Sequence, residues 1–103
     1  MLLPLAIAVA LTAPPAITGN CNPTRVHFNG TITSDAPTKV TYTWVRPNQP
    51  PGRTYTLEFP KAGSLPVTYD LLLRKHEQGW VMLRVIWPEK AESAKVKYQV
   101  ECK

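Results

Sequence analysis

The side chains with the clearest chemistry are the two cysteines, Cys21 and Cys102. One follows an apolar N-terminal stretch and the other is the penultimate residue, so a bond between them would close almost all of the chain beyond that stretch. A disulfide over about 80 residues contributes roughly 4.5 kcal/mol in the chain-entropy model, which is comparable with the stability of a small domain. This placement predicts a disulfide in an exported protein. Two unrelated buried thiols in a cytosolic protein are the alternative.

The other reactive side chains do not form a catalytic pattern. His27 is expected on the outward face of a strand and His76 in a turn, so we expect neither to act as a metal ligand or a general base. The sequence has no pair of histidines at metal-ligand spacing, no glycine-rich phosphate loop and no serine in a nucleophile elbow. We therefore expect no enzyme activity, no metal and no cofactor.

The basic charge of the chain is dispersed. The net charge is +5, and no run of basic residues is longer than Arg74-Lys75. This dispersal argues against nucleic acid as a partner, because a surface that follows phosphates needs clustered cations. It favours a solvated basic surface, with an extracellular protein or an anionic cell-wall polymer as the partner.

The first 19 residues carry no charged side chain and read MLLPLAIAVALTAPPAITG. Their apolar core, residues 2–11, is too short to span a bilayer and is typical of a secretory signal peptide. Cleavage is expected after Ala10 or after Gly19. We expect residues 1–19 to contribute nothing to the core, and residues 20–103 to form the folded domain without a membrane span.

Beyond Cys21, apolar and polar residues alternate in segments that turn residues separate. Six strands are predicted, at residues 25–33, 39–46, 55–59, 67–73, 80–87 and 94–102. The eleven prolines leave little room for long helices. The pattern predicts an all-β sandwich of six or seven antiparallel strands, in which Trp44 is a core residue packed near the disulfide.

The strand at 80–87 is apolar on both faces. We assign one alternating set to the core: Val81, Leu83, Val85 and Trp87. The other set contains an arginine and is therefore expected on the outer face: Trp80, Met82, Arg84 and Ile86. These outer residues are either covered by a neighbouring loop or form an exposed patch that recognises a partner, since tryptophan and arginine are common at interfaces.

Four motifs lie on or beside these strands: Phe28–Ile32 (FNGTI), Val40–Arg46 (VTYTWVR), Gly79-Trp80 followed by Leu83-Arg84-Val85 and Pro88, and an alternating strand from Val96 to Cys102. Over residues 21–102 they resemble a family of bacterial secreted immunoglobulin-like domains. The resemblance implies an immunoglobulin-like β-sandwich in an extracellular setting. It also implies a module for recognition rather than for catalysis, although the fold alone names no ligand.

The expected function is therefore that of a non-catalytic extracellular module, secreted or held at the cell surface, which recognises a protein. A carbohydrate-binding module and a structural spacer are the alternatives. A sugar binder should expose two or three coplanar aromatic rings. A spacer should lack an apolar surface patch larger than is normal for a monomer.

Overall fold

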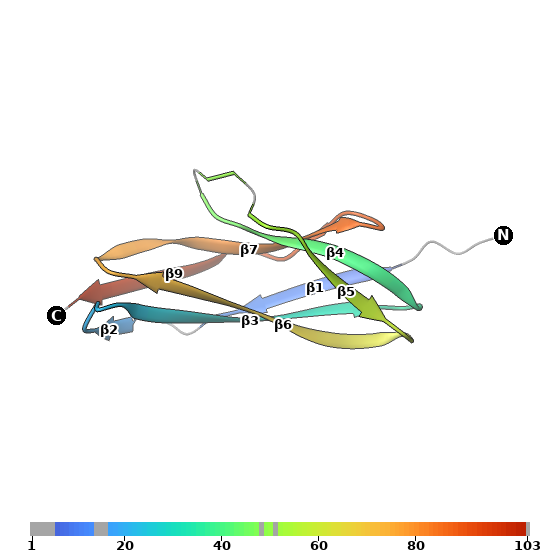
Figure 1. Cartoon of the computed structure of the whole chain (residues 1–103), viewed down its shortest axis with the longest axis horizontal. Helices are drawn as coiled ribbons and strands as arrows, with labels where there is room; N and C mark the ends of the chain where they lie inside the picture. Colours follow the sequence, from blue (N-terminus) through green and yellow to red (C-terminus); the bar gives the residue numbers. More distant parts are fainter. Residues whose placement is uncertain (1–5, 14–16, 48, 51, 103) are drawn as a thin grey trace.

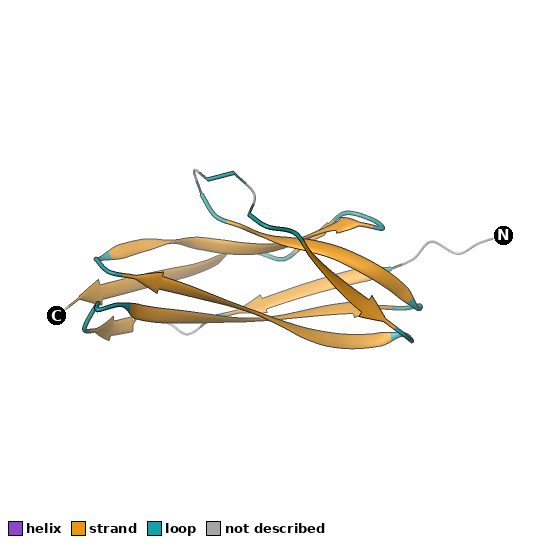
Figure 2. Cartoon of the chain, in the orientation of Figure 1, coloured by secondary structure: helices purple, strands orange, loops and turns teal. Residues whose placement is uncertain are grey.

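The computed structural model of the chain describes residues 6–13, 17–47, 49–50 and 52–102. These residues form strands and connections only (Figure 2). The strands make two β-sheets that pack face to face, so the predicted all-β sandwich is confirmed (Figure 1). Within the described ranges, no helix is long and apolar enough to cross a membrane.

The smaller sheet has three antiparallel strands in the order β1-β3-β6. They are β1 (Ile7–Thr12), β3 (Thr24–Ser34) and β6 (Gly63–Leu73). The two long strands β3 and β6 pair along their whole length, with Phe28 opposite Tyr69. Because of this continuous pairing, β3 and β6 form most of the smaller sheet, and the second sheet packs against them.

The larger sheet has the order β2-β9-β7-β4-β5, and the short β8 also pairs with β7. Its members are β2 (Ile17–Gly19), β4 (Thr38–Val45), β5 (Tyr55–Phe59), β7 (Glu77–Trp87), β8 (Ala91–Glu92) and β9 (Val96–Cys102). All neighbours in this sheet are antiparallel except β2, which runs parallel to β9. The structure thus contains each of the six predicted strands, together with β1, β2 and β8, which the alternation did not predict.

The core lies between the two sheets and is built from the alternate residues of each strand. The fully buried members are Val26, Phe28 and Ile32 of β3, Val40 of β4, and Val81, Leu83 and Val85 of β7. Gly30 lies among them, where a Cβ atom would come within 3.0 Å of the side chains of Leu83 and Val67. A glycine at this position therefore lets the two sheets approach closely.

The N-terminal segment packs against this core, so the expectation that residues 1–19 contribute nothing to it is wrong. Strand β1 pairs with β3 over six residue pairs. Ile7, Val9 and Leu11 are partly buried against the core, whereas Ala8 and Ala10 are exposed. A signal peptide and an edge strand with alternating large and small apolar residues can have the same amino-acid sequence pattern, so the sequence alone does not distinguish them. That residues 1–19 also act as a signal peptide stays a prediction.

The predicted disulfide between Cys21 and Cys102 is confirmed, with the two Cα atoms 5.4 Å apart. It ties the connection before β3 to the end of β9. Trp44 is buried as predicted, with 6% of its surface exposed, but it does not pack near the bridge. It lies opposite Leu83 on β7, whereas Val100, two residues before the bridge, lies opposite Glu77. Six residues of β7 separate these two levels, or about 20 Å at about 3.3 Å per residue.

Candidate functional site

Strand β7 changes phase near its end. Tyr42 of β4 pairs with Val85, but the adjacent Thr41 pairs with Trp87, so Ile86 is an extra residue in a β-bulge. Because side chains alternate between the faces of a strand, one extra residue moves the next side chain to the opposite face. Trp87 therefore lies on the outer face of the larger sheet.

This bulge decides which predicted core residues are buried. Val81, Leu83 and Val85 have no exposed surface, which confirms their assignment to the core. Trp87 is 56% exposed, so its assignment to the core is wrong. The alternation predicted the face correctly up to the bulge and incorrectly beyond it.

The four residues of the predicted patch share the outer face of β7 but differ in exposure. Met82 is buried, with 7% of its surface exposed. Trp80 is partly covered, and the Lys95 ammonium lies 4.6 Å from the centroid of its ring. Arg84 is also partly covered and donates a hydrogen bond of 2.6 Å from Nε to Glu92 Oε2. The patch is therefore not a continuous apolar surface, because its middle is buried.

The exposed apolar area of the outer face lies instead at the bulge. Ile86 is 46% exposed and adjoins Trp87 in the chain. A shallow hollow beside Ile86 is lined by Thr43, Arg84 and Lys90. We call Arg84, Ile86 and Trp87 the bulge surface. It combines two large apolar side chains with a guanidinium.

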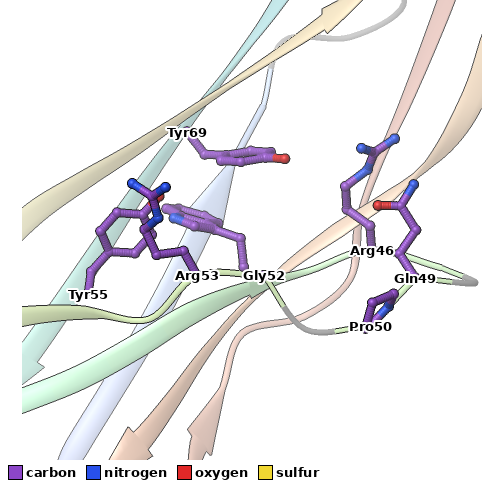
Figure 3. Close-up of a pocket in the computed structure, with 8 residues that line it drawn as sticks. Arg46, Gln49, Pro50, Gly52, Arg53, Tyr55 and Tyr69 are labelled. Carbon is purple, nitrogen blue, oxygen red and sulfur yellow. The ribbon is translucent and has the colours of Figure 1, made fainter.

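A second concave region lies beside the β4–β5 connection (Figure 3). We call it the β4–β5 cavity. Its volume is about 180 Å³, and an apolar cavity of about 150 Å³ is known to hold one benzene molecule. Its walls include Trp44, Arg46, Arg53, Tyr55 and Tyr69.

Aromatic rings from both sheets meet at this cavity. The ring of Tyr69 on β6 stacks on Trp44 of β4, with centroids 5.1 Å apart and planes inclined by 23°. Tyr55 of β5 stacks on Tyr42 at 5.4 Å. Only one of these four rings is strongly exposed, namely Tyr55 at 40%. The stack therefore forms a fixed wall rather than an open platform.

Arg46 lies across the cavity from Tyr55 and Arg53, and the Tyr69 hydroxyl points to the side on which Arg46 lies (Figure 3). Its Nη2 atom is 3.3 Å from Glu77 Oε2, which also accepts a hydrogen bond of 2.5 Å from the Tyr98 hydroxyl. Burial acts to lower the pKa of Arg46, but Tyr98, Tyr69 and Glu77 together raise it, so the guanidinium stays charged. Burial, and then the bond to Glu77, raise the pKa of Tyr98 above its usual value.

One donor of Arg46 has no partner. Its Nε atom is buried and makes no hydrogen bond. A buried donor left unsatisfied costs about 1–3 kcal/mol, so such a group calls for a physical explanation.

The histidines lie apart from both surfaces. His27 is on the outer face of the smaller sheet, where it binds Asp70 across the strand pair. His76 precedes β7, and its Nδ1 atom accepts a hydrogen bond from the Cys102 backbone N–H. Across residues 6–13, 17–47, 49–50 and 52–102, no group of three or more histidine, cysteine, aspartate or glutamate side chains is placed to hold a metal ion.

Two comparisons with known proteins found no match. No protein-family model matches the sequence, and a search of curated proteins finds no similar sequence. The resemblance of the strand motifs to bacterial immunoglobulin-like domains therefore stays a hypothesis.

Sequence reasoning found Arg84 and Ile86 of the bulge surface but placed Trp87 on the wrong face. It did not identify the β4–β5 cavity at all. Tyr55 and Tyr69 stand at the apolar positions of their strands, which is the ordinary signal of a core residue. The only local hint was a pair of arginines in the connection between the two strands, Arg46 directly after β4 and Arg53 shortly before β5.

Proposed function

We propose that this chain is a non-catalytic immunoglobulin-like module that acts outside the cell, secreted or at the cell surface, and recognises a protein partner. The strand order supports the immunoglobulin-like assignment. Taking β1, β3 and β6 as strands A, B and E, and β4, β5, β7 and β9 as C, C′, F and G, the sheets read A-B-E and G-F-C-C′. The buried Trp44 on β4 occupies the strand that carries the core tryptophan of such sandwiches.

The Cys21–Cys102 disulfide supports the extracellular setting, because structural disulfides persist in oxidising compartments. Its position differs from the usual bridge between strands B and F, since it ties the connection before β3 to the end of β9. The module therefore resembles the immunoglobulin fold in strand order and differs from antibody domains in its covalent link.

The observation that carries the recognition function is the exposure of Ile86 and Trp87 side by side next to Arg84. Aromatic and arginine side chains are enriched in the energetically important centres of interfaces. The bulge places them there, and bulges are frequent at functional positions of sheets. Trp87 is 56% exposed, so a large part of its ring lies in water unless a partner covers it.

The two other functions are less well supported. A sugar-binding platform needs two or three coplanar exposed rings, but the strongly exposed aromatic residues among those described are Tyr55 and Trp87, and one face of Tyr55 is covered by Tyr42. A spacer has no need of an exposed tryptophan. An anionic cell-wall polymer stays the second candidate partner, favoured by the net charge of +5.

The test places a photo-crosslinking amino acid at Trp87 and, as a control, at Thr31, which is exposed on the other sheet. Each labelled protein is added to intact cells of the source organism and irradiated. We expect a protease-sensitive adduct from position 87 that excess unlabelled protein suppresses, and none from position 31. Adducts that form equally from both positions, or that resist protease, would contradict a protein-recognition role.

A variant of Trp87, used as the unlabelled competitor, tests whether this side chain is needed for binding. Trp87→Ser should keep the melting temperature close to that of the parent, because an exposed side chain contributes little to stability. It should fail to suppress the adduct. A folded Trp87→Ser protein that competes as well as the parent would show that the bulge surface is not the recognition site.

A further inference from the structure

A further interaction surface lies at the edge of the smaller sheet, where β1 is the outermost strand (Figure 1). Its sequence, IAVALT, contains no charged residue and no proline, and its pairing with β3 runs without a bulge. Charged side chains, prolines and bulges are the features that protect a sheet edge from pairing with another chain. β1 has none of these features.

The other edge strands differ from β1 in this respect. β6, at the opposite edge of the smaller sheet, contains Pro66 and Asp70. β5, at one edge of the larger sheet, has five residues and contains Glu58. β2 and β8 have only three and two residues. Among the described strands, β1 is therefore the edge best suited to pair with a further strand.

The backbone groups at the open side of β1 can be assigned from its contacts with β3. The Ala6 carbonyl accepts a hydrogen bond from the Asp35 N–H, so the backbone groups of Ala6 face the β3 side. Successive residues of an antiparallel strand direct their N–H and C=O groups alternately toward and away from the partner strand. The groups of Ile7, Val9 and Leu11 therefore point away from β3, where the described part of the chain supplies no neighbouring strand.

The open side of β1 is complementary to itself. In an antiparallel pair of two copies, one register places Val9 opposite its own counterpart and Ile7 opposite Leu11, so every outward N–H and C=O of the three residues gains a partner. The same register places Ala8 opposite Ala10 on the outer face. A shift by two residues leaves outward groups unpaired, and a shift by one residue reverses the faces.

The side chains favour the same pairing. Ile7, Val9 and Leu11 are only partly buried in the single chain, so a second copy at this edge can cover more of their apolar surface. The absence of charge along β1 lets two copies meet here although each carries a net charge of +5. Six residues extend about 20 Å, which gives a small interface and a weak dimer.

We propose that two copies of this chain form a dimer by antiparallel pairing of their β1 strands. The two smaller sheets then join in the order β6-β3-β1-β1-β3-β6. The pairing is symmetric and uses the whole open edge, so it closes at two copies. It uses a different surface from the bulge surface, which lies on the outer face of the larger sheet. The dimer and the recognition function can therefore be tested separately.

The experiment uses the intact chain, and mass spectrometry verifies that residues 1–19 are present. Sedimentation equilibrium from micromolar to millimolar concentration should show a reversible change from monomer to dimer. Over the same range, hydrogen exchange followed by NMR should become slower at the amides of Ile7, Val9 and Leu11. A chain that stays monomeric, species larger than a dimer, or exchange at these amides that does not depend on concentration would overturn the proposal.

Charge variants on the exposed face of β1 test the register. Ala8→Lys/Ala10→Lys places like charges opposite each other in the dimer and should weaken dimerisation at least about fivefold. Ala8→Lys/Ala10→Glu places opposite charges there and should dimerise at least about tenfold more tightly than the first variant. Equal dimerisation of these two variants would exclude the register.

A matched control adds the same two positive charges to the same face away from the edge. Thr31→Lys/Thr68→Lys, at exposed positions of β3 and β6, should dimerise nearly as well as the parent. A loss equal to that of Ala8→Lys/Ala10→Lys would show that net charge, and not the β1 edge, controls the association. Melting temperatures verify that the variants are folded. If a lysine variant does not fold, the concentration dependence of amide exchange in the parent still decides.

Discussion

At the scale of single residues, the most specific polar contact is the pair of His27 and Asp70 on the outer face of the smaller sheet. The two residues lie directly opposite each other on β3 and β6, and His27 Nδ1 is 2.5 Å from Asp70 Oδ1. The other ring nitrogen is 3.1 Å from Asn29 Oδ1. Both neighbouring atoms are hydrogen-bond acceptors, so the doubly protonated ring satisfies both contacts and the neutral ring only one.

The first prediction concerns the pKa of His27. The hydrogen bond to Asp70 raises this pKa above its ordinary value and outweighs desolvation, which acts to lower it. Because the pKa is higher in the folded than in the unfolded chain, the pair stabilises the fold fully below the unfolded pKa of about 6.5. That contribution is lost as the pH rises through the folded pKa. An NMR titration of the His27 ring should show the raised pKa, and Asp70→Asn should lower it.

The same variant provides the stability control. The difference in melting temperature between the parent and Asp70→Asn should be largest at mildly acidic pH and should shrink toward alkaline pH. A difference that grows with rising pH would contradict the assigned direction of the shift.

At the scale of the elements, the least expected strand is β1. It covers one edge of β3, and its alternate side chains Ile7, Val9 and Leu11 reach the core. An edge strand protects the backbone groups of its neighbour and part of the core from water. Its contribution can be tested without shortening the chain, because its two faces differ.

The second prediction compares two substitutions that add the same charge to the two faces of β1. Val9→Asp places a carboxylate on the partly buried face and should lower the free energy of unfolding by about 1–3 kcal/mol. Ala10→Asp places it on the exposed face, where we expect a change within about 0.5 kcal/mol. Urea denaturation of both proteins measures the difference. Equal stabilities would show that β1 does not pack on the core in solution.

At the scale of the whole molecule, the disulfide is the strongest constraint. It links residues 81 positions apart and holds the end of β9 beside the start of β3. Cys21 lies in the connection from β2 of the larger sheet to β3 of the smaller sheet, so the bond fixes this crossing between the two layers to β9. A domain of this size buries a limited core, so we expect such a link to contribute much of its stability.

The third prediction is that the double substitution Cys21→Ala and Cys102→Ala lowers the free energy of unfolding by roughly 4.5 kcal/mol, the value for a loop of this length in the chain-entropy model. Denaturant titration of the variant beside the oxidised parent gives the loss. The reduced parent serves as a control that keeps both sulfur atoms, and it should unfold at the same denaturant concentration as the variant. A loss below about 1 kcal/mol would mean that the unfolded chain is already constrained by other means.

The sequence alone determined the strands β3, β4, β5, β6, β7 and β9, the inward faces of most of them, and the disulfide. Alternation with a period of two is a local property of each segment, so it can be recognised without knowing which strand the segment pairs with. The inward phase of Cys102 and the position of Cys21 before the first predicted strand were likewise readable along the chain.

Only the tertiary structure decided which face Trp87 occupies, whether residues 7–12 pack, and that Arg46, Arg53 and Tyr69 share one cavity. A bulge arises from the match between two strands, and Ile86 is extra only relative to Tyr42 and Thr41 on β4. An edge strand forms only by pairing with a neighbouring strand, here β3, and the sequence of β1 does not reveal that partner. The cavity joins residues of three strands and their connections, so its chemistry exists only once the two sheets have packed.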